Sequence, residues 1–241
     1  MNRNSNTYIV IYATVLVVIV ALALSFAALG LKERQQANVE SEMKSAILRS
    51  IGVELHGGKA AIDALYARYI VGSFAVDAHG EVVEGANAFE LLAGLREIYA
   101  LPPQERELPM FVSRDDEGVE RYIIPLWGGG LWGPIWGYLA LESDWQTISG
   151  AVFYHQGETP GLGAEIAEPS FGNRFEGKTI FRDGRFVSIS VEKRRGTEPA
   201  GQHSVDAISG GTITSYGVER MIRESLQGYL PFIQMKMGDG K

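Results

Sequence analysis

The run Asp206–Ser215 groups residue types that are suited to holding a phosphate. It contains two adjacent glycines and four hydroxyl side chains, and an apolar pattern typical of a helix follows it. Glycine lets the backbone turn freely and lets a bulky group approach closely. A helix start offers unpaired N–H groups and the positive end of the helix dipole, and both favour an anion. The run therefore indicates a phosphate site, with a common hydroxyl-capped turn as the alternative. The residues concerned are Ser209, Gly210, Gly211, Thr212, Thr214 and Ser215.

Two further glycine-rich segments lie between expected strands, at 128–134 and 157–165. The first contains Leu131 and Trp132. The second contains Glu158, Thr159, Gly161, Leu162 and Gly163. The Asp206–Ser215 run lacks the lysine of a P-loop and the glycine spacing of a Rossmann fingerprint, so neither nucleotide-binding motif explains it.

The spacing Asp206-x-x-Ser209-Gly210-x-Thr212 resembles the flavinylation motif. In proteins with that motif, a threonine hydroxyl accepts FMN from a flavin transferase that uses FAD, and an aspartate helps the transferase recognise the site. The resemblance implies that Thr212 is the acceptor and Asp206 the recognition residue. Gly211 stands where alanine is usual, which is the one departure from the motif.

Three more segments extend the resemblance to nearly the whole chain. They are Leu131-Trp132, Gly137–Glu142 and Glu158–Gly163, and their order is that of the C subunit of the Na⁺-translocating NADH:quinone oxidoreductase. The G subunit of the Rnf electron-transport complex shares the flavinylation motif and is the nearest alternative. A membrane-tethered binding module without a cofactor, in which the glycine loops only make turns, is an alternative of a different class.

The resemblance implies an electron-transfer subunit of a sodium-translocating NADH:quinone reductase, inactive alone, with FMN linked by a phosphoester to Thr212. It implies partners among the other membrane and peripheral subunits of a six-subunit complex, including iron–sulfur subunits and a second covalent-FMN subunit. It places the domain on the periplasmic side of a bacterial inner membrane. It also predicts that the residues of the three glycine-rich segments bind the cofactor: Leu131, Trp132, Glu158, Thr159, Gly161, Leu162, Gly163, Asp206, Ser209, Gly210, Gly211 and Thr214. Core packing is the alternative for Trp132.

The composition limits the other chemistry that this chain can perform. The chain has no cysteine, so disulfides, thiolate metal sites and cysteine nucleophiles are excluded. The four histidines show no metal spacing, and no catalytic residue is predicted. A formal charge of −7 with no basic stripe gives no sign of nucleic-acid binding.

The apolar pattern predicts one membrane anchor and one domain. Residues 8–31 carry no charge and are long enough to cross a hydrocarbon core of about 30 Å. A signal peptide is the alternative, although its apolar region would be shorter. Residues 1–7 form a short tail, 32–52 a helical stalk that ends at Gly52, and 53–241 the FMN-binding domain. Lipid is therefore also an expected partner.

The domain combines strand and helix patterns, so the predicted fold class is α+β with a mainly antiparallel sheet. Helices are expected at 59–70, 86–99 and after the Asp206–Ser215 run. Strands are expected at 73–78, 81–83, 122–127, 136–142, 148–155, 178–182 and 185–193. Asp183-Gly184 predicts a tight hairpin turn between the last two.

Overall fold

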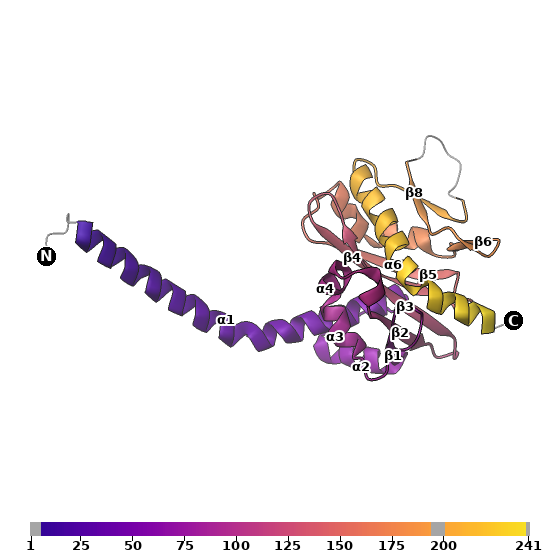
Figure 1. Ribbon diagram of the computed structural model, residues 1–241, viewed down its shortest axis with the longest axis horizontal. Coiled ribbons are helices and arrows are strands. Elements are labelled where there is room, and N and C mark those ends of the chain that lie inside the picture. The colour runs from indigo at the N-terminus through magenta and orange to yellow at the C-terminus, as the bar shows by residue number, and fades with distance from the viewer. Residues whose placement is uncertain (1–5, 194–200, 240–241) are drawn as a thin grey trace. The chain divides into compact units, whose positions relative to one another are not determined.

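The computed structural model describes residues 6–193 and 201–239 and divides into two compact units, with the boundary between Met43 and Lys44. The first unit is the greater part of helix α1 (Asn6–Ser50). By length and composition this helix can cross a membrane, and its large apolar side chains are exposed. The predicted anchor at 8–31 lies within it. Figure 1 shows α1 as one continuous helix.

The second unit begins with the last turns of α1, inside the segment predicted as a stalk. Ala46, Ile47 and Leu48 are buried in this unit. The helix ends at Ser50, whose hydroxyl donates to the Ile47 carbonyl at 2.7 Å. Gly52 follows with φ +78°, a left-handed conformation that favours glycine after a helix.

A five-stranded antiparallel sheet forms the centre of the second unit, with its strands side by side in chain order. Antiparallel neighbours need only short connections, as between the last four strands, whereas residues 77–107 between the first two strands contain short helices. The strands are β1 (Ile70–Val76), β2 (Leu108–Arg114), β3 (Glu120–Gly129), β4 (Pro134–Leu141) and β5 (Ile148–His155). The short helices are α2 (Lys59–Tyr69), α3 (Ala88–Ala93), α4 (Leu95–Ala100) and η1 (Pro103–Glu105).

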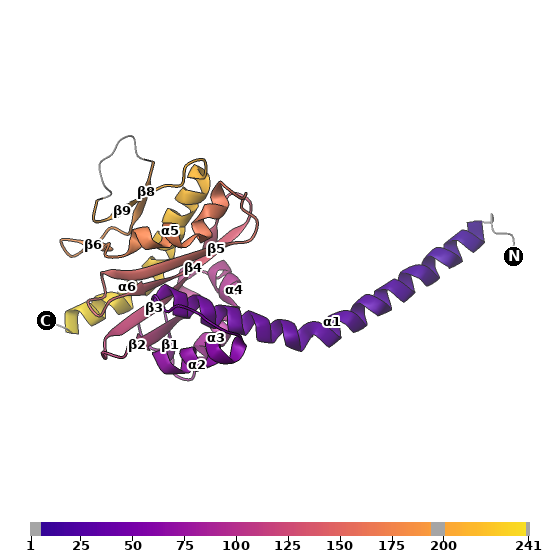
Figure 2. The same cartoon turned by 180° about the vertical axis from the view of Figure 1, so that it is seen from behind.

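Helix α6 (Thr212–Asp239) covers one face of the sheet and packs mainly against β3. It lies in front of the sheet in Figure 1 and behind it in Figure 2. Its buried residues recur at helical spacing, as in Val218, Ile222 and Leu226. The smaller elements between β5 and α6 are η2 (Gly163–Ala167), α5 (Pro169–Gly172), η3 (Asn173–Phe175), β6 (Phe181–Arg182), β7 (Arg185–Phe186), β8 (Ser190–Glu192) and β9 (Ser204–Asp206).

The predicted fold class is confirmed, but several predicted elements need correction. The helix expected at 86–99 is two helices separated at Gly94, and only Val82 of the strand expected at 81–83 makes a bridge. The strands expected at 178–182 and 185–193 shrink to β6, β7 and β8, although the turn at Asp183-Gly184 is present with positive φ at both residues.

Strand β2 was not predicted, because Pro109 normally argues against a central strand. β2 pairs with β1 over residues 108–113, whereas its pairing with β3 covers only residues 111–114. The Pro109 segment therefore has a strand partner on one side alone, where the missing N–H is tolerated. Its carbonyl accepts a hydrogen bond from the Tyr229 hydroxyl of α6 at 2.8 Å.

Candidate functional site

The Glu158 carboxylate joins the three glycine-rich segments. Its Oε1 accepts hydrogen bonds from the N–H groups of Leu131 and Trp132, at 2.7 and 2.9 Å. Its Oε2 accepts from the Thr214 hydroxyl at 2.7 Å. Glu158 is only 5% exposed, so burial alone would be costly for a carboxylate, and these three donors satisfy it. Segments 27 and 56 residues away along the chain thus meet at one side chain.

Gly163, a predicted site residue, and Gly130, which was not predicted, both lie where a side chain would meet this carboxylate. A Cβ at Gly130 would overlap Oε1 of Glu158, and a Cβ at Gly163 would overlap both Oε2 and the Thr214 hydroxyl. Any side chain at either position would push Glu158 away from its partners. Glycine here makes room for a protein side chain.

The hydroxyl residues of the run differ in their burial. Thr214 and Ser215 are buried, Thr214 donating to Glu158 and Ser215 accepting from the Ile208 N–H at 3.0 Å. Thr212 is half-buried and Ser209 is exposed. The hydroxyls accessible from the surface are therefore those of Ser209 and Thr212, and only Thr212 belongs to the helix.

The turn before α6 brings the second and third glycine-rich segments into contact. Gly210 has φ +78°, and a Cβ there would clash with the Leu162 side chain. Gly211, the residue before the helix, lies against the Leu162 backbone. Since Gly211 has no side chain to cap the helix, the first N–H groups of α6 remain available to an anion.

Asp206 lies at the end of β9, which pairs in parallel with β8. Its side chain is exposed, and its carbonyl accepts a hydrogen bond from Arg174 Nη1 at 2.7 Å. The same guanidinium lies over the Phe171 ring. Arg174 therefore fixes the start of the run, a role the sequence did not predict because it acts on a backbone carbonyl.

His155 is a second residue that sequence reasoning missed. Its Nδ1 faces the Glu158 N–H at 3.2 Å, at the end of β5. The contact helps to orient the loop that carries Glu158. Only its place three residues before Glu158 hinted at this role.

Five large apolar side chains on these segments are exposed. Trp132 is 67% exposed, which rules out core packing as its role, and Leu162 is 44% exposed. Thr159 and Gly161 are exposed beside Leu162. Together the five form what we call the apolar rim: Leu131, Trp132, Leu162, Ile213 and Tyr216. Scattered exposed apolar residues are ordinary, but five of them on the segments that meet at Glu158 and at the start of α6 indicate a ligand surface.

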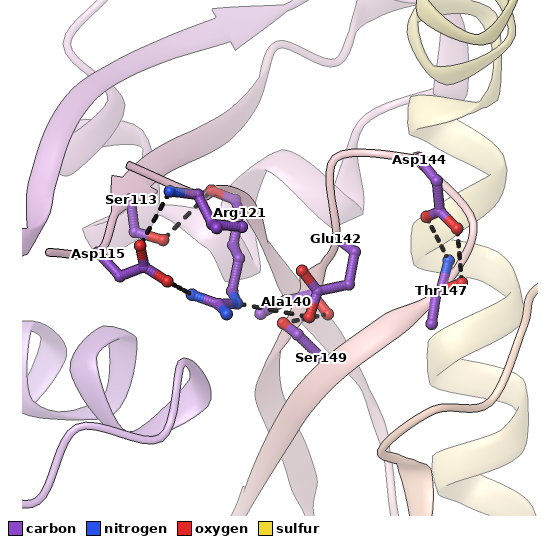
Figure 3. Close-up of polar contacts among 9 residues, drawn as sticks. Ser113, Asp115, Arg121, Ala140, Glu142, Asp144, Thr147 and Ser149 are labelled. Carbon is purple, nitrogen blue, oxygen red and sulfur yellow. Dashed lines mark hydrogen bonds and ion pairs between the residues drawn. The ribbon is translucent and has the colours of Figure 1, made fainter. Parts of the chain in front are cut away.

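The opposite end of β4 has a different character (Figure 3). Arg121 lies between Asp115 and Glu142, at 2.8 and 3.5 Å, and the N–H of Val119 and this guanidinium lower the pKa of Asp115. In the adjacent turn, Asp144 accepts the Thr147 hydroxyl at 2.6 Å. These contacts stabilise the turns at the ends of the strands. Within residues 6–193 and 201–239, no cluster of His, Asp or Glu side chains suits a metal ion.

The FMN-binding domain family matches residues 130–227, a range that includes Glu158 and all three of its hydrogen-bond donors. The C subunit of the Na(+)-translocating NADH-quinone reductase of Vibrio alginolyticus is 32% identical over 237 residues, which are 92% of this chain and 91% of that protein. This chain belongs to the C-subunit family.

Two solved structures of C subunits resemble the present one. The structure from Parabacteroides distasonis is 44% identical, with a TM-score of 0.74, and the match covers 84% of this chain and 96% of that one. The Shewanella oneidensis NqrC structure is 28% identical, with a TM-score of 0.72, covering 84% and 99%. The predicted resemblance to the C subunit, rather than to the G subunit of the Rnf complex, is thereby confirmed.

Proposed function

We propose that this chain is the electron-transferring C subunit of a Na⁺-translocating NADH:quinone oxidoreductase and carries FMN as a phosphoester on Thr212. The accessible Thr212 hydroxyl at the start of α6 carries the proposal. It lies in the run that resembles the flavinylation motif, within a chain of the C-subunit family. The other threonine of the turn, Thr214, is 1% exposed and committed to Glu158.

The residues around Thr212 suit the two chemically different ends of FMN. The free N–H groups of the first turn of α6 favour a phosphate. The apolar rim offers surface to a flat aromatic ring, with Leu131 and Trp132 on one segment and Leu162 on another. When bound, the flavin supplies reversible one-electron redox chemistry, and the protein orients it.

Attachment requires a partner enzyme, because a threonine hydroxyl is a poor nucleophile near neutral pH. The donor is FAD, bound by a flavin transferase with a metal ion on its pyrophosphate. Thr212 Oγ1 forms a new bond to the phosphorus on the riboflavin side, the pyrophosphate P–O bond breaks, and AMP leaves. The threonine proton passes to a base on the transferase. Asp206, exposed six residues earlier, is placed for recognition by that enzyme.

The chain has its role only within the complex. We infer that its electron donor is an iron–sulfur centre in partner membrane subunits and its acceptor a second covalent FMN on a neighbouring subunit. The apolar helix α1 and membership of a membrane-complex family fit an inner-membrane protein. We assign the domain to the periplasmic side, where a covalent bond prevents loss of the flavin.

The test is flavin fluorescence on a denaturing gel. The full chain, produced with an FAD-using flavin transferase, is expected to give a fluorescent band, and Thr212→Ala none. Ser170→Ala, which removes an exposed hydroxyl outside the run, is the control and should keep the band. A dark wild-type band would contradict the covalent cofactor, and a bright Thr212→Ala band would contradict the acceptor. Co-purification of the other subunits from native membranes tests the assignment to the complex.

A further inference from the structure

We propose that Glu158 is a positioning residue. It holds the first turn of α6, which bears the flavin on Thr212, in place relative to the Leu131-Trp132 turn, on which the flavin rests. The inference rests on the proposed function, in which Thr212 bears the flavin. Glu158 uses one carboxylate oxygen for the Leu131-Trp132 turn and the other for Thr214, in the first turn of α6. One buried side chain therefore holds the two ends of the cofactor site together.

The first turn of α6 needs such a contact. It follows Gly210 and Gly211, the least constrained residues for a backbone, and it carries no acidic side chain to complement the helix dipole. Residues that begin a helix also lack half of their backbone hydrogen bonds. The Thr214 hydroxyl supplies a contact to a charged acceptor, which is among the stronger side-chain hydrogen bonds.

The Leu131-Trp132 turn depends on the same carboxylate. Both backbone N–H groups point at Oε1 of Glu158, while both side chains are turned outward, 45% and 67% exposed. The turn is thus held by its backbone, which leaves its side chains free to contact a ligand. Without Glu158 these two donors would lose their partner.

Attachment of the flavin and orientation of its ring depend on different residues. Attachment needs the Thr212 hydroxyl and the transferase, neither of which Glu158 touches. Orientation of the ring requires that the first turn of α6 and the Leu131-Trp132 turn keep a fixed position relative to each other. Glu158 bonds to both segments. Loss of Glu158 should therefore leave a flavin that is attached but mobile.

Thr214→Val and Glu158→Ala test this in the full chain co-produced with the transferase. Thr214→Val keeps the shape of the side chain and removes the hydroxyl. We expect both variants to retain covalent flavin on a denaturing gel. In the folded protein, the equilibrium constant between ordered and mobile flavin should fall about tenfold or more, the effect of losing one hydrogen bond to a charged group. Lower flavin fluorescence anisotropy and weaker visible circular dichroism would report this loss.

Conservative variants separate positioning from a general loss of stability. Thr214→Ser keeps the hydroxyl. Glu158→Gln keeps an oxygen for the two N–H groups and gains an amide that donates to Thr214. Both should restore the wild-type anisotropy. Thr147→Val is the matched control, because it removes a threonine–carboxylate hydrogen bond of 2.6 Å, to Asp144 at the other end of β4. It should lower the melting temperature and leave the flavin signals unchanged.

Wild-type anisotropy and dichroism in both Thr214→Val and Glu158→Ala would overturn the inference. If Glu158→Ala does not fold, Thr214→Val decides alone. An absence of covalent flavin from the wild-type chain would refute the proposed function itself, an outcome distinct from failure of the positioning role.

Discussion

Thr212 and Thr214 lie on opposite sides of the first turn of α6, because residues two apart in a helix are separated by about 200°. Thr214 points inward and donates to Glu158, whereas Thr212 stays half-buried at the surface. The turn therefore offers a large modifying enzyme one threonine and hides the other. This geometry distinguishes two residues that a short motif alone would leave equally plausible.

Gly163→Ala should destabilise the domain. The new Cβ would overlap the Glu158 carboxylate and the Thr214 hydroxyl, and overpacking of this kind costs about 1–3 kcal/mol. Gly157→Ala, in the same loop, is the control, because its Cβ would meet only the Trp132 carbonyl at 3.6 Å. Equilibrium unfolding in urea measures both free energies. Equal losses in the two variants would contradict the steric role of Gly163.

Stability should fall at alkaline pH through two buried tyrosines. Burial raises the pKa of Tyr99 to about 12, and burial raises the pKa of Tyr229 well above its usual 10. Since both pKa values are higher in the folded chain, the unfolded chain ionises first as pH rises. The unfolding free energy is then complete below pH 10 and declines as pH rises towards 12.

Thermal unfolding at a series of pH values, with tyrosinate absorbance recorded in parallel, checks this dependence. Tyr229→Phe should weaken it and also lose about 1 kcal/mol at neutral pH, because the Pro109 carbonyl loses its donor. Ionisation of every tyrosine near pH 10 in the folded state would refute the prediction.

A chain that begins at Lys44 should be soluble and folded, since the compact unit starts there. A chain that begins at Gly52 lacks Ile47 and Leu48, which are fully buried. Burial of each such side chain contributes about 1.5–3 kcal/mol, so the shorter chain should melt at a clearly lower temperature. Size-exclusion chromatography and thermal melts compare the two. Identical melting temperatures would show that the end of α1 adds nothing to the domain.

Trp132→Ala should affect the flavin signal, whereas Trp145→Ala should affect the stability of the domain. Trp132 is 67% exposed, so its loss should change the unfolding free energy by about 0.5 kcal/mol or less while weakening the visible dichroism of the bound flavin. Trp145 is 6% exposed and stacks on Tyr122, so its loss should cost about 3–5 kcal/mol. A large loss of stability in Trp132→Ala would mean that this residue serves the core.

Much of the fold follows from local sequence patterns. Strand β5 has the predicted bounds, and the helix expected at the end of the chain is present as α6, because both patterns are regular and long. Gly94 divided a predicted helix, since its N–H already closes α3 on the Glu90 and Leu91 carbonyls. Pro109 concealed β2, because a strand paired on one side at that point looks the same in sequence as a loop.

The site was predictable as a set of segments and not as a set of contacts. The resemblance singled out the glycine-rich segments and gave Glu158 as a cofactor-binding residue, which stays a prediction. The structure directs its carboxylate to protein groups. Periodicity cannot show that a loop carboxylate is buried, because its partners lie 27 and 56 residues away. The role of Arg174 was not predicted for the same reason, because its partner is a carbonyl 32 residues along the chain.

The exposure of Trp132 gives the protein a built-in optical reporter. The other three tryptophans are buried or partly buried in stacks with other aromatic rings, whereas Trp132, in the apolar rim, makes no such stack within residues 6–193 and 201–239. Indole emission overlaps flavin absorption, so a flavin held on Thr212 would quench Trp132 by resonance energy transfer. The intrinsic emission of an unlabelled sample would then decrease as the flavin is loaded, and the kinetics of maturation could be followed without a gel.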